Sequence, residues 1–182
     1  RSVCLFGAGM LGLTACAMAR SLGAAEIVCV DPASNRRELA RTFGASHVLA
    51  PQEFTTAAGS IVGTLGFDVV VELSGSAAAF HAAWPMLRTG GVLVLVGSVF
   101  PSPPVSIALE QIVRRHLMIR GVHNYAPRHL LAAVEFLATH HTQVPFAGLV
   151  AQWLPLASID RAFALSRHPD AVRIGINPAA TP

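Results

Sequence analysis

Short apolar runs alternate along the chain with longer stretches in which apolar residues recur at helical spacing. The apolar runs have the length and the Val, Ile and Leu content of buried parallel strands, and they cover residues 2–6, 26–30, 46–49, 68–73, 91–97 and 117–122. Helices are predicted between them over residues 11–22, 36–43, 54–65, 76–87 and 107–116. Ser34 and Asn35 are suited to cap the second helix, and Pro85 is expected to shorten the fourth. The alternation predicts a doubly wound α/β domain built on a six-stranded parallel sheet.

Beyond residue 122 the predicted elements are smaller. They are a helix over 128–139, an apolar run over 149–154, a short helix over 158–166 and a last strand over 172–176. Six strands with five crossovers already complete one sheet. We therefore expect two parts, residues 1–122 and residues 123–182, of which the second is too small to stand alone.

A glycine-rich turn follows the first predicted strand. Its sequence is Gly7-Ala8-Gly9-Met10-Leu11-Gly12, and Asp31 ends the second strand nineteen residues after the last of these glycines. In a dinucleotide-binding βαβ unit, the first glycine makes the tight turn, the second lets the backbone approach a pyrophosphate, and the third lets helix pack on strand. The backbone N–H groups of Met10 and Leu11 would face the pyrophosphate. The pattern predicts a Rossmann fold, and a glycine turn followed by an Asp that only caps the next helix is the alternative.

Asp31 bears on the choice of dinucleotide. A carboxylate in this position accepts hydrogen bonds from both hydroxyls of the adenosine ribose, whereas a 2′-phosphate there would meet a like charge. Proteins that bind NADP usually have a small residue followed by Arg, but Asp31 is followed by Pro32. The sequence therefore favours NAD. An Asx-turn made by Asp31 is the alternative role for this side chain.

Composition excludes several kinds of chemistry. The chain contains 13 Arg and no Lys, whereas Walker-A phosphate binding, Schiff-base catalysis and the Tyr-x-x-x-Lys pair of short-chain reductases each need a lysine amine. The net charge of +3 comes from scattered Arg residues, which do not form a basic stripe for nucleic acid. The eight His residues form no metal-ligand pattern, so no metal site is expected within this chain.

The three cysteines indicate a reducing compartment. Cys4, Cys16 and Cys29 lie on predicted apolar elements at spacings of 12 and 13 residues, where free Cys behaves as a small core hydrophobe. No apolar run reaches the roughly 18 to 20 residues of a membrane span, and no secretory signal pattern is present. We therefore expect a cytoplasmic protein without a membrane partner.

Taken together, these motifs resemble the medium-chain dehydrogenase/reductase family, and in particular the cofactor-binding half of its zinc-type alcohol dehydrogenases. The matching positions are residues 7–12, 30–31 with Arg36, 43–45, 67–70, 90–91, 96–97 and 171–174. The run at 110–115, with 119–125, is similar to the branch associated with phosphonate catabolism. The resemblance implies an NAD-binding Rossmann domain in residues 1–122 and a C-terminal segment, 123–182, that returns toward a catalytic domain.

The catalytic domain that the family requires lies outside this sequence. In the family, the ligands of the catalytic zinc precede the cofactor domain, and they are a Cys, a His followed by Glu, and a second Cys. We therefore expect the cofactor half of an NAD-dependent alcohol dehydrogenase of roughly twice this length, with zinc held by the absent part and with this chain inactive alone. Hydride would pass between NAD and a small alcohol or aldehyde. A non-catalytic NAD-sensing module and a zinc-free enoyl or quinone reductase of the same superfamily are the alternatives.

The predicted cofactor crevice lies at the carboxyl ends of the strands, where the order of a doubly wound sheet reverses. The residues that end the fourth and fifth strands are expected to line it: Leu73, Ser74, Gly75, Val96, Gly97 and Ser98. The resemblance implies that these residues border the adenosine ribose and the nicotinamide. It also implies that residues near Met118 and Arg120 lie beside the carboxamide.

Further roles follow from the resemblance for two arginines and for the sixth strand. Arg36 is similar to the family's basic residue beside the adenosine ribose, whereas Arg37 and Arg41 are expected on the solvated face of the same helix. Arg173 matches the arginine that reaches the pyrophosphate from the last strand. Because the family pairs through the open edge of the cofactor sheet, the resemblance implies a homodimer through the strand at 117–122.

Overall fold

A computed structural model describes residues 1–168 and 171–180 of the chain. It divides into two compact units, residues 1–131 and residues 132–182. The division falls within helix α6 (Pro127–His140). None of the helices in the described ranges combines the length and apolar character that a membrane span needs.

The first unit is built on one six-stranded parallel sheet with the strand order β3-β2-β1-β4-β5-β6. Its strands are β1 (Ser2–Phe6), β2 (Glu26–Val30), β3 (His47–Leu49), β4 (Phe67–Glu72), β5 (Leu87–Leu95) and β6 (Met118–Gly121). The order reverses between β1 and β4, which confirms the doubly wound Rossmann architecture.

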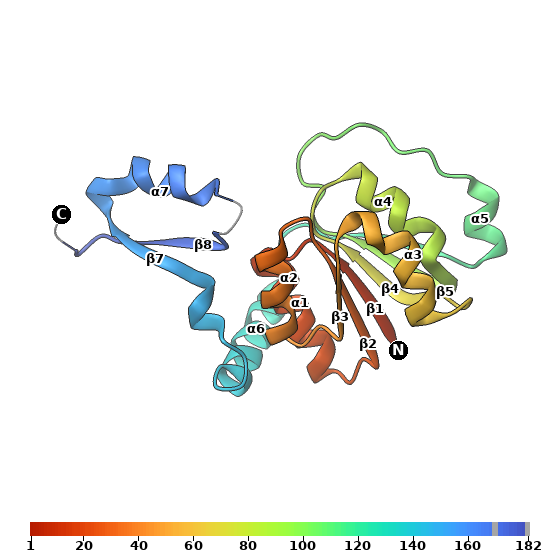
Figure 1. Ribbon diagram of the computed structural model, residues 1–182, viewed down its shortest axis with the longest axis horizontal. Coiled ribbons are helices and arrows are strands. Elements are labelled where there is room, and N and C mark those ends of the chain that lie inside the picture. Colours follow the sequence, from red (N-terminus) through yellow and green to blue (C-terminus); the bar gives the residue numbers. More distant parts are fainter. Residues whose placement is uncertain (169–170, 181–182) are drawn as a thin grey trace. The chain divides into compact units, whose positions relative to one another are not determined.

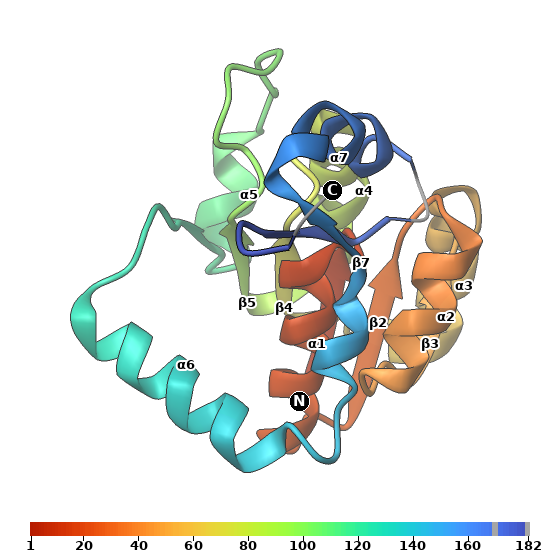
Figure 2. The same ribbon diagram turned by 90° about the vertical axis from the view of Figure 1, so that its left-hand side faces the viewer.

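Five helices connect the strands of this sheet: α1 (Met10–Ser21), α2 (Ser34–Thr42), α3 (Pro51–Val62), α4 (Ala77–Ala83) and α5 (Leu109–Arg114). Figures 1 and 2 show α1 and α2 on one face of the sheet and α3, α4 and α5 on the other. This distribution follows from right-handed crossovers on both sides of the point where the strand order reverses.

Aromatic side chains fill the core between the sheet and helices α3 and α4. Phe54 meets Phe6 edge to face at 4.8 Å between ring centroids and stacks on Phe67 at 6.3 Å. Phe80 stacks on Trp84 at 5.8 Å. Aromatic contacts of this geometry add to the burial of apolar surface. Those of Phe54 hold α3 against β1 and β4, and Phe80 and Trp84 belong to the same buried cluster.

The start of α2 and the end of α4 are each set by local interactions. Helix α2 begins at Ser34, and Ala33 is its N-cap without a side-chain hydrogen bond, so the prediction that Ser34 and Asn35 cap this helix is wrong. The turn before the helix is held instead by the Asp31 carboxylate, which accepts from the backbone N–H of Ala33 at 2.8 Å. Helix α4 ends at Ala83, and the segment Trp84–Met86 that contains Pro85 is a 3₁₀ turn, which confirms the shortening effect of this proline.

The three cysteines are free and buried, as their apolar neighbours in the sequence predict. The hydrogen bond that the Cys29 thiol shares with Cys16 and the burial of the thiol together raise the pKa of Cys29 well above its usual value. Burial, followed by the nearby Cys16, raises the pKa of the Cys4 thiol. Protonated, enclosed thiols act as small core hydrophobes.

The second unit contains a parallel pair of strands, β7 (Val150–Pro155) and β8 (Arg173–Asn177), connected through α7 (Ile159–Ser166). Short 3₁₀ turns at Phe146–Leu149 and Leu156–Ser158 precede β7 and α7. The Trp153 ring lies against Gly175, where a Cβ atom would collide with it.

Candidate functional site

The glycine turn leaves β1 and enters α1 at the carboxyl edge of the sheet. Gly7 has a φ of 104°, a conformation that favours glycine, and an added Cβ would lie 3.2 Å from the backbone nitrogen of Ser74. A Cβ at Gly12 would overlap the carbonyl oxygen of Gly7. At Gly9, the N-cap of α1, a Cβ would meet no atom within 4 Å. Two glycines are therefore required by the fold itself, whereas Gly9 keeps an open space in front of the helix N-terminus.

This open space is suited to an anion. The first intrahelical bond of α1 runs from the N–H of Leu13 to the carbonyl oxygen of Gly9 at 2.9 Å. The helix dipole favours negative charge at the first turn of a helix. Met10 and Leu11 are the first two residues of this turn, so the geometry fits a pyrophosphate over Gly9.

Asp31 lies directly after β2 and is buried, with 4% of its surface exposed. Its Oδ2 accepts from the N–H of Ala8 at 2.7 Å, and its Oδ1 accepts from the N–H of Ala33 at 2.8 Å. The second bond is an Asx-type turn, so this role of Asp31 is present in the structure. A carboxylate has about four acceptor positions, which leaves capacity for two ribose hydroxyls.

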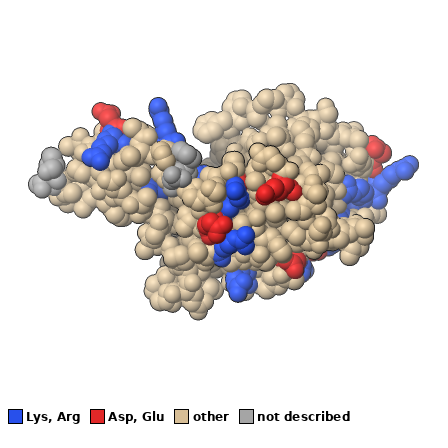
Figure 3. All heavy atoms as spheres, in the orientation of Figure 1, with Lys and Arg blue, Asp and Glu red and all other residues tan. Residues whose placement is uncertain are grey.

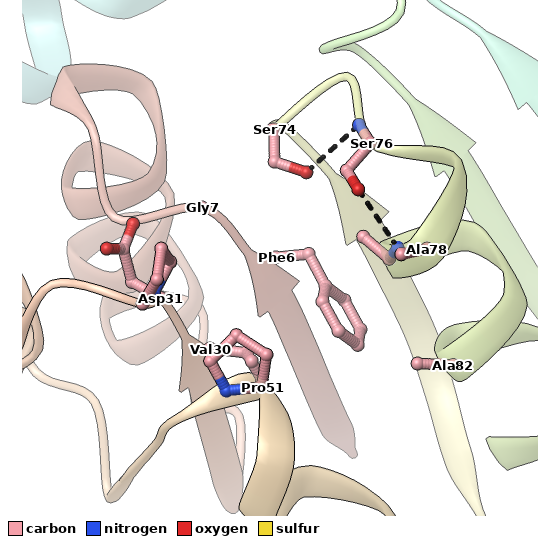
Figure 4. A pocket seen from close by; sticks show the side chains of 11 residues that line it. Phe6, Gly7, Val30, Asp31, Pro51, Ser74, Ser76, Ala78 and Ala82 are labelled. Atoms are coloured by element: carbon pink, nitrogen blue, oxygen red, sulfur yellow. Dashed lines mark hydrogen bonds between the residues drawn. The ribbon is translucent and has the colours of Figure 1, made fainter. Parts of the chain in front are cut away.

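A cavity of about 320 Å³ opens beside Asp31. Figure 4 shows Val30, Asp31 and Pro51 on one side of the cavity, Ser74, Ser76 and α4 on the other, and Phe6 between them. The lining is largely apolar and comes from β1, β2, α3 and α4, and Asp31, Ser74 and Ser76 are its polar members. Such a lining suits a flat, weakly polar ring attached to a hydroxylated sugar.

The predicted residues at the ends of β4 and β5 are brought together. A Cβ at Gly75 would lie 2.8 Å from the carbonyl oxygen of Gly97, so the two backbones are in direct contact. Ser74 lines the cavity beside Asp31, and Ser98 lines a second, more open cavity of about 530 Å³ at the ends of β5 and β6. Each of the two loops that meet at this contact thus lines a different cavity.

Glu72, the last residue of β4, is a site feature that the sequence analysis missed. It is 1% exposed, and its carboxylate accepts hydrogen bonds from the loop that follows β4. The available signal was its position, because Glu72 ends β4 as an acid ahead of a Ser-Gly-Ser turn, much as Asp31 follows β2.

The register of β6 determines which of its residues reach the carboxyl edge. Met118 pairs with Val92, and Arg120 pairs with Val94. Met118 starts the strand three residues before Gly121, which is roughly 10 Å along a strand. The structure therefore does not bring Met118 to the edge, and the second cavity is lined instead by Gly121, Val122 and His123.

Arg36, Arg37 and Arg41 have different surroundings on α2. Arg41 is exposed and lies 3.6 Å from Glu38, as expected for the solvated face. Arg37 does not lie there, because its Nη1 donates to the carbonyl oxygens of Asp31 and Pro32 at 2.8 and 2.9 Å. Arg36 is half-buried near the start of the helix, and its contact with a ribose stays a prediction.

Arg173 lies in the second unit, where it is the first residue of β8 and pairs with Val150. Its contact with a pyrophosphate therefore stays a prediction. Among the described residues, no group of three or more His, Cys, Asp or Glu side chains is arranged to hold a metal ion. On the face shown in Figure 3, Arg and acidic side chains are scattered rather than gathered into one patch.

Comparisons with known proteins agree with this geometry. A model of the zinc-binding dehydrogenase family matches residues 11–139. An L-threonine 3-dehydrogenase from Pectobacterium atrosepticum is 32% identical over 123 residues, which cover 66% of this chain and 34% of that protein. The chain thus spans about a third of the length of this curated relative.

Solved structures share the fold over almost the whole chain. An alcohol dehydrogenase from Thermotoga maritima is 26% identical, with a TM-score of 0.89, and the match covers 97% of this chain and 49% of that protein. The fold also matches a Sinorhizobium meliloti dehydrogenase bound to NADP, at 22% identity and a TM-score of 0.80. It matches an Escherichia coli alcohol dehydrogenase complexed with NADH at 17% identity and a TM-score of 0.81. Each of these two matches covers 96% of this chain and 51% of that protein.

Proposed function

This chain belongs to the zinc-binding dehydrogenase family, and we propose that it is the nicotinamide-binding part of an NAD-dependent alcohol dehydrogenase. The chain corresponds to the cofactor-binding domain of such enzymes and matches about half the length of the Thermotoga alcohol dehydrogenase. When bound, the dinucleotide would supply the hydride acceptor for oxidation of an alcohol. Zinc would be held by residues outside this chain.

The observation that carries the proposal is that the open space in front of Gly9 and the buried carboxylate of Asp31 lie at the same carboxyl edge of the sheet. The space in front of Gly9 would receive the pyrophosphate, and Asp31 would accept from the adenosine ribose. The cavity beside Asp31 would hold the adenine, and the nicotinamide would lie toward the cavity at the ends of β5 and β6. We propose that Arg36 binds the adenosine ribose and that Arg173 binds the pyrophosphate.

NAD is the preferred dinucleotide in this proposal. Asp31 is buried and already accepts two backbone N–H groups. A 2′-phosphate would bring a second negative charge to this carboxylate in a partly desolvated cleft, which disfavours NADP.

The substrate and the oligomeric state are proposed for the whole enzyme. L-threonine is the first alcohol to test, because the curated relative acts on it by name. We further propose a homodimer through the edge strand β6, where Met118 is 56% exposed and Val122, directly after the strand, is 43% exposed. Three free, buried thiols support a cytoplasmic location.

The deciding experiment compares NAD with NADP on the wild-type chain and on Asp31→Ser by calorimetric titration. We expect the wild type to bind NAD more tightly by at least about tenfold, and the variant to lose most of this preference. Arg41→Ala, which removes an exposed charge farther along α2, is the matched control and should leave both affinities unchanged. The ratio is the readout, because a general loss of structure would weaken both ligands alike. An unchanged ratio in Asp31→Ser would refute the assignment.

A further inference from the structure

Glu72 is a buried carboxylate that the proposed hydride chemistry does not use. Its Oε1 accepts from the N–H of Ser74 at 2.7 Å, from the N–H of Gly75 at 2.9 Å and from the hydroxyl of Ser74 at 2.5 Å. Its Oε2 lies 3.4 Å from the hydroxyl oxygen of Ser98. These donors are all neutral groups, and they belong to the loops that follow β4 and β5 rather than to the strands themselves.

The main chain of Glu72 holds the second loop as well. Its carbonyl oxygen accepts from the N–H groups of Val96 and Gly97 at 2.8 and 2.9 Å. The same loop contacts the first one through Gly75 and Gly97. One residue therefore ties together the two loops that come nearest to each other at the carboxyl edge.

These loops serve different ends of the candidate site. Ser74 lines the cavity that contains Asp31, and Ser98 lines the cavity at the ends of β5 and β6. A dinucleotide must reach across both, whereas a mononucleotide such as AMP needs only the first. The relative placement of the two loops therefore matters most for the longer ligand.

On the premise of the proposed function, we propose that Glu72 is a positioning residue that aligns the adenosine end of the dinucleotide site with its nicotinamide end. Its carboxylate keeps the loop after β4 in the conformation that meets the loop after β5. Without that carboxylate, the N–H groups of Ser74 and Gly75 lose their acceptor, and the loop is free to move away from Gly97.

The test measures dissociation constants of NADH and AMP by calorimetry for the wild-type chain, Glu72→Ala, Glu72→Gln and Asp68→Asn. Asp68 is the matched control, because it also lies on β4 and accepts a backbone N–H, from Ser2, but at the opposite end of the strand. In Glu72→Ala we expect the affinity for NADH to fall about tenfold and the affinity for AMP to fall less than about threefold. Glu72→Gln keeps an acceptor oxygen and should restore the wild-type ratio, and Asp68→Asn should not change it.

Equal losses of NADH and AMP affinity in Glu72→Ala would assign Glu72 a merely structural role and overturn the inference, while the proposed function would stand. A wild-type chain that binds neither ligand would overturn the proposed function itself. If Glu72→Ala does not fold, Glu72→Asp replaces it, since the shorter Asp31 shows that an aspartate at a strand end reaches the N–H two residues on. Aspartate would not reach Ser98, so the NADH affinity should fall about threefold with AMP unchanged, and an unchanged ratio would refute the positioning role.

Discussion

The contrast between Gly9 and Gly12 makes the sharpest prediction about the glycine turn. In Gly9→Val the new side chain points into open space, and the residue has a φ of −74°, which valine adopts readily. The cost to folding should therefore be limited to the poorer N-cap, about 1 kcal/mol or less. That cost corresponds to a fall in Tm of roughly 2 to 4 °C for a protein of this size.

Binding should respond far more strongly than folding does. The valine side chain would occupy the space in which a pyrophosphate approaches the backbone, so we expect NADH affinity to fall at least about 100-fold, or about 2.7 kcal/mol. The matched variant is Gly12→Ala. The alanine side chain is smaller than that of valine, but its Cβ would overlap the carbonyl oxygen of Gly7. Overpacking of this kind typically costs about 1 to 3 kcal/mol, so Gly12→Ala should lower Tm more than Gly9→Val.

The assay combines thermal unfolding by circular dichroism with titration of NADH fluorescence. Wild-type affinity in a folded Gly9→Val variant would refute the placement of the pyrophosphate. A Gly12→Ala variant as stable as the wild type would show that helix α1 does not depend on close contact with the glycine turn.

Three further results are expected. A backbone hydrogen bond from Ser2, assisted by Arg88, lowers the pKa of Asp68 to about 2. The ionised Asp68 should therefore stabilise the fold by about 1 kcal/mol after solvent screening. This stabilisation should be complete above pH 5 and be lost as the pH falls toward 2. Denaturant unfolding of wild type and Asp68→Asn at pH 6 and pH 3 checks this, and a difference that does not shrink at pH 3 would contradict it. The thiols of Cys4, Cys16 and Cys29 should react with a chromogenic disulfide reagent only after unfolding, and rapid reaction in the native state would contradict their burial. Light scattering at tens of micromolar should show a homodimer, and a monomer alone would count against pairing through β6.

Much of the fold and part of the site could be predicted from the sequence, because those features depend on local patterns. Buried parallel strands require continuous apolar runs, and β1 and β2 lie where those runs lie. The glycine turn also has a local signature, since the positive φ of Gly7 and the close approach at Gly12 restrict both positions to glycine.

Tertiary structure alone decided the features that depend on contacts between distant segments. The register between β5 and β6 places Gly121 to His123, and not Met118, at the edge, because pairing between parallel strands is set by packing of the whole sheet rather than by the pattern within one strand. The contact of Arg37 with the carbonyl oxygens of Asp31 and Pro32 is local in sequence, but the direction of its side chain was also decided by the folded turn, since helical spacing alone suggested a solvated charge. The contact between Glu72 and Ser98 could be recognised only once the ends of β4 and β5 were adjacent, since Ser98 lies 26 residues away along the chain.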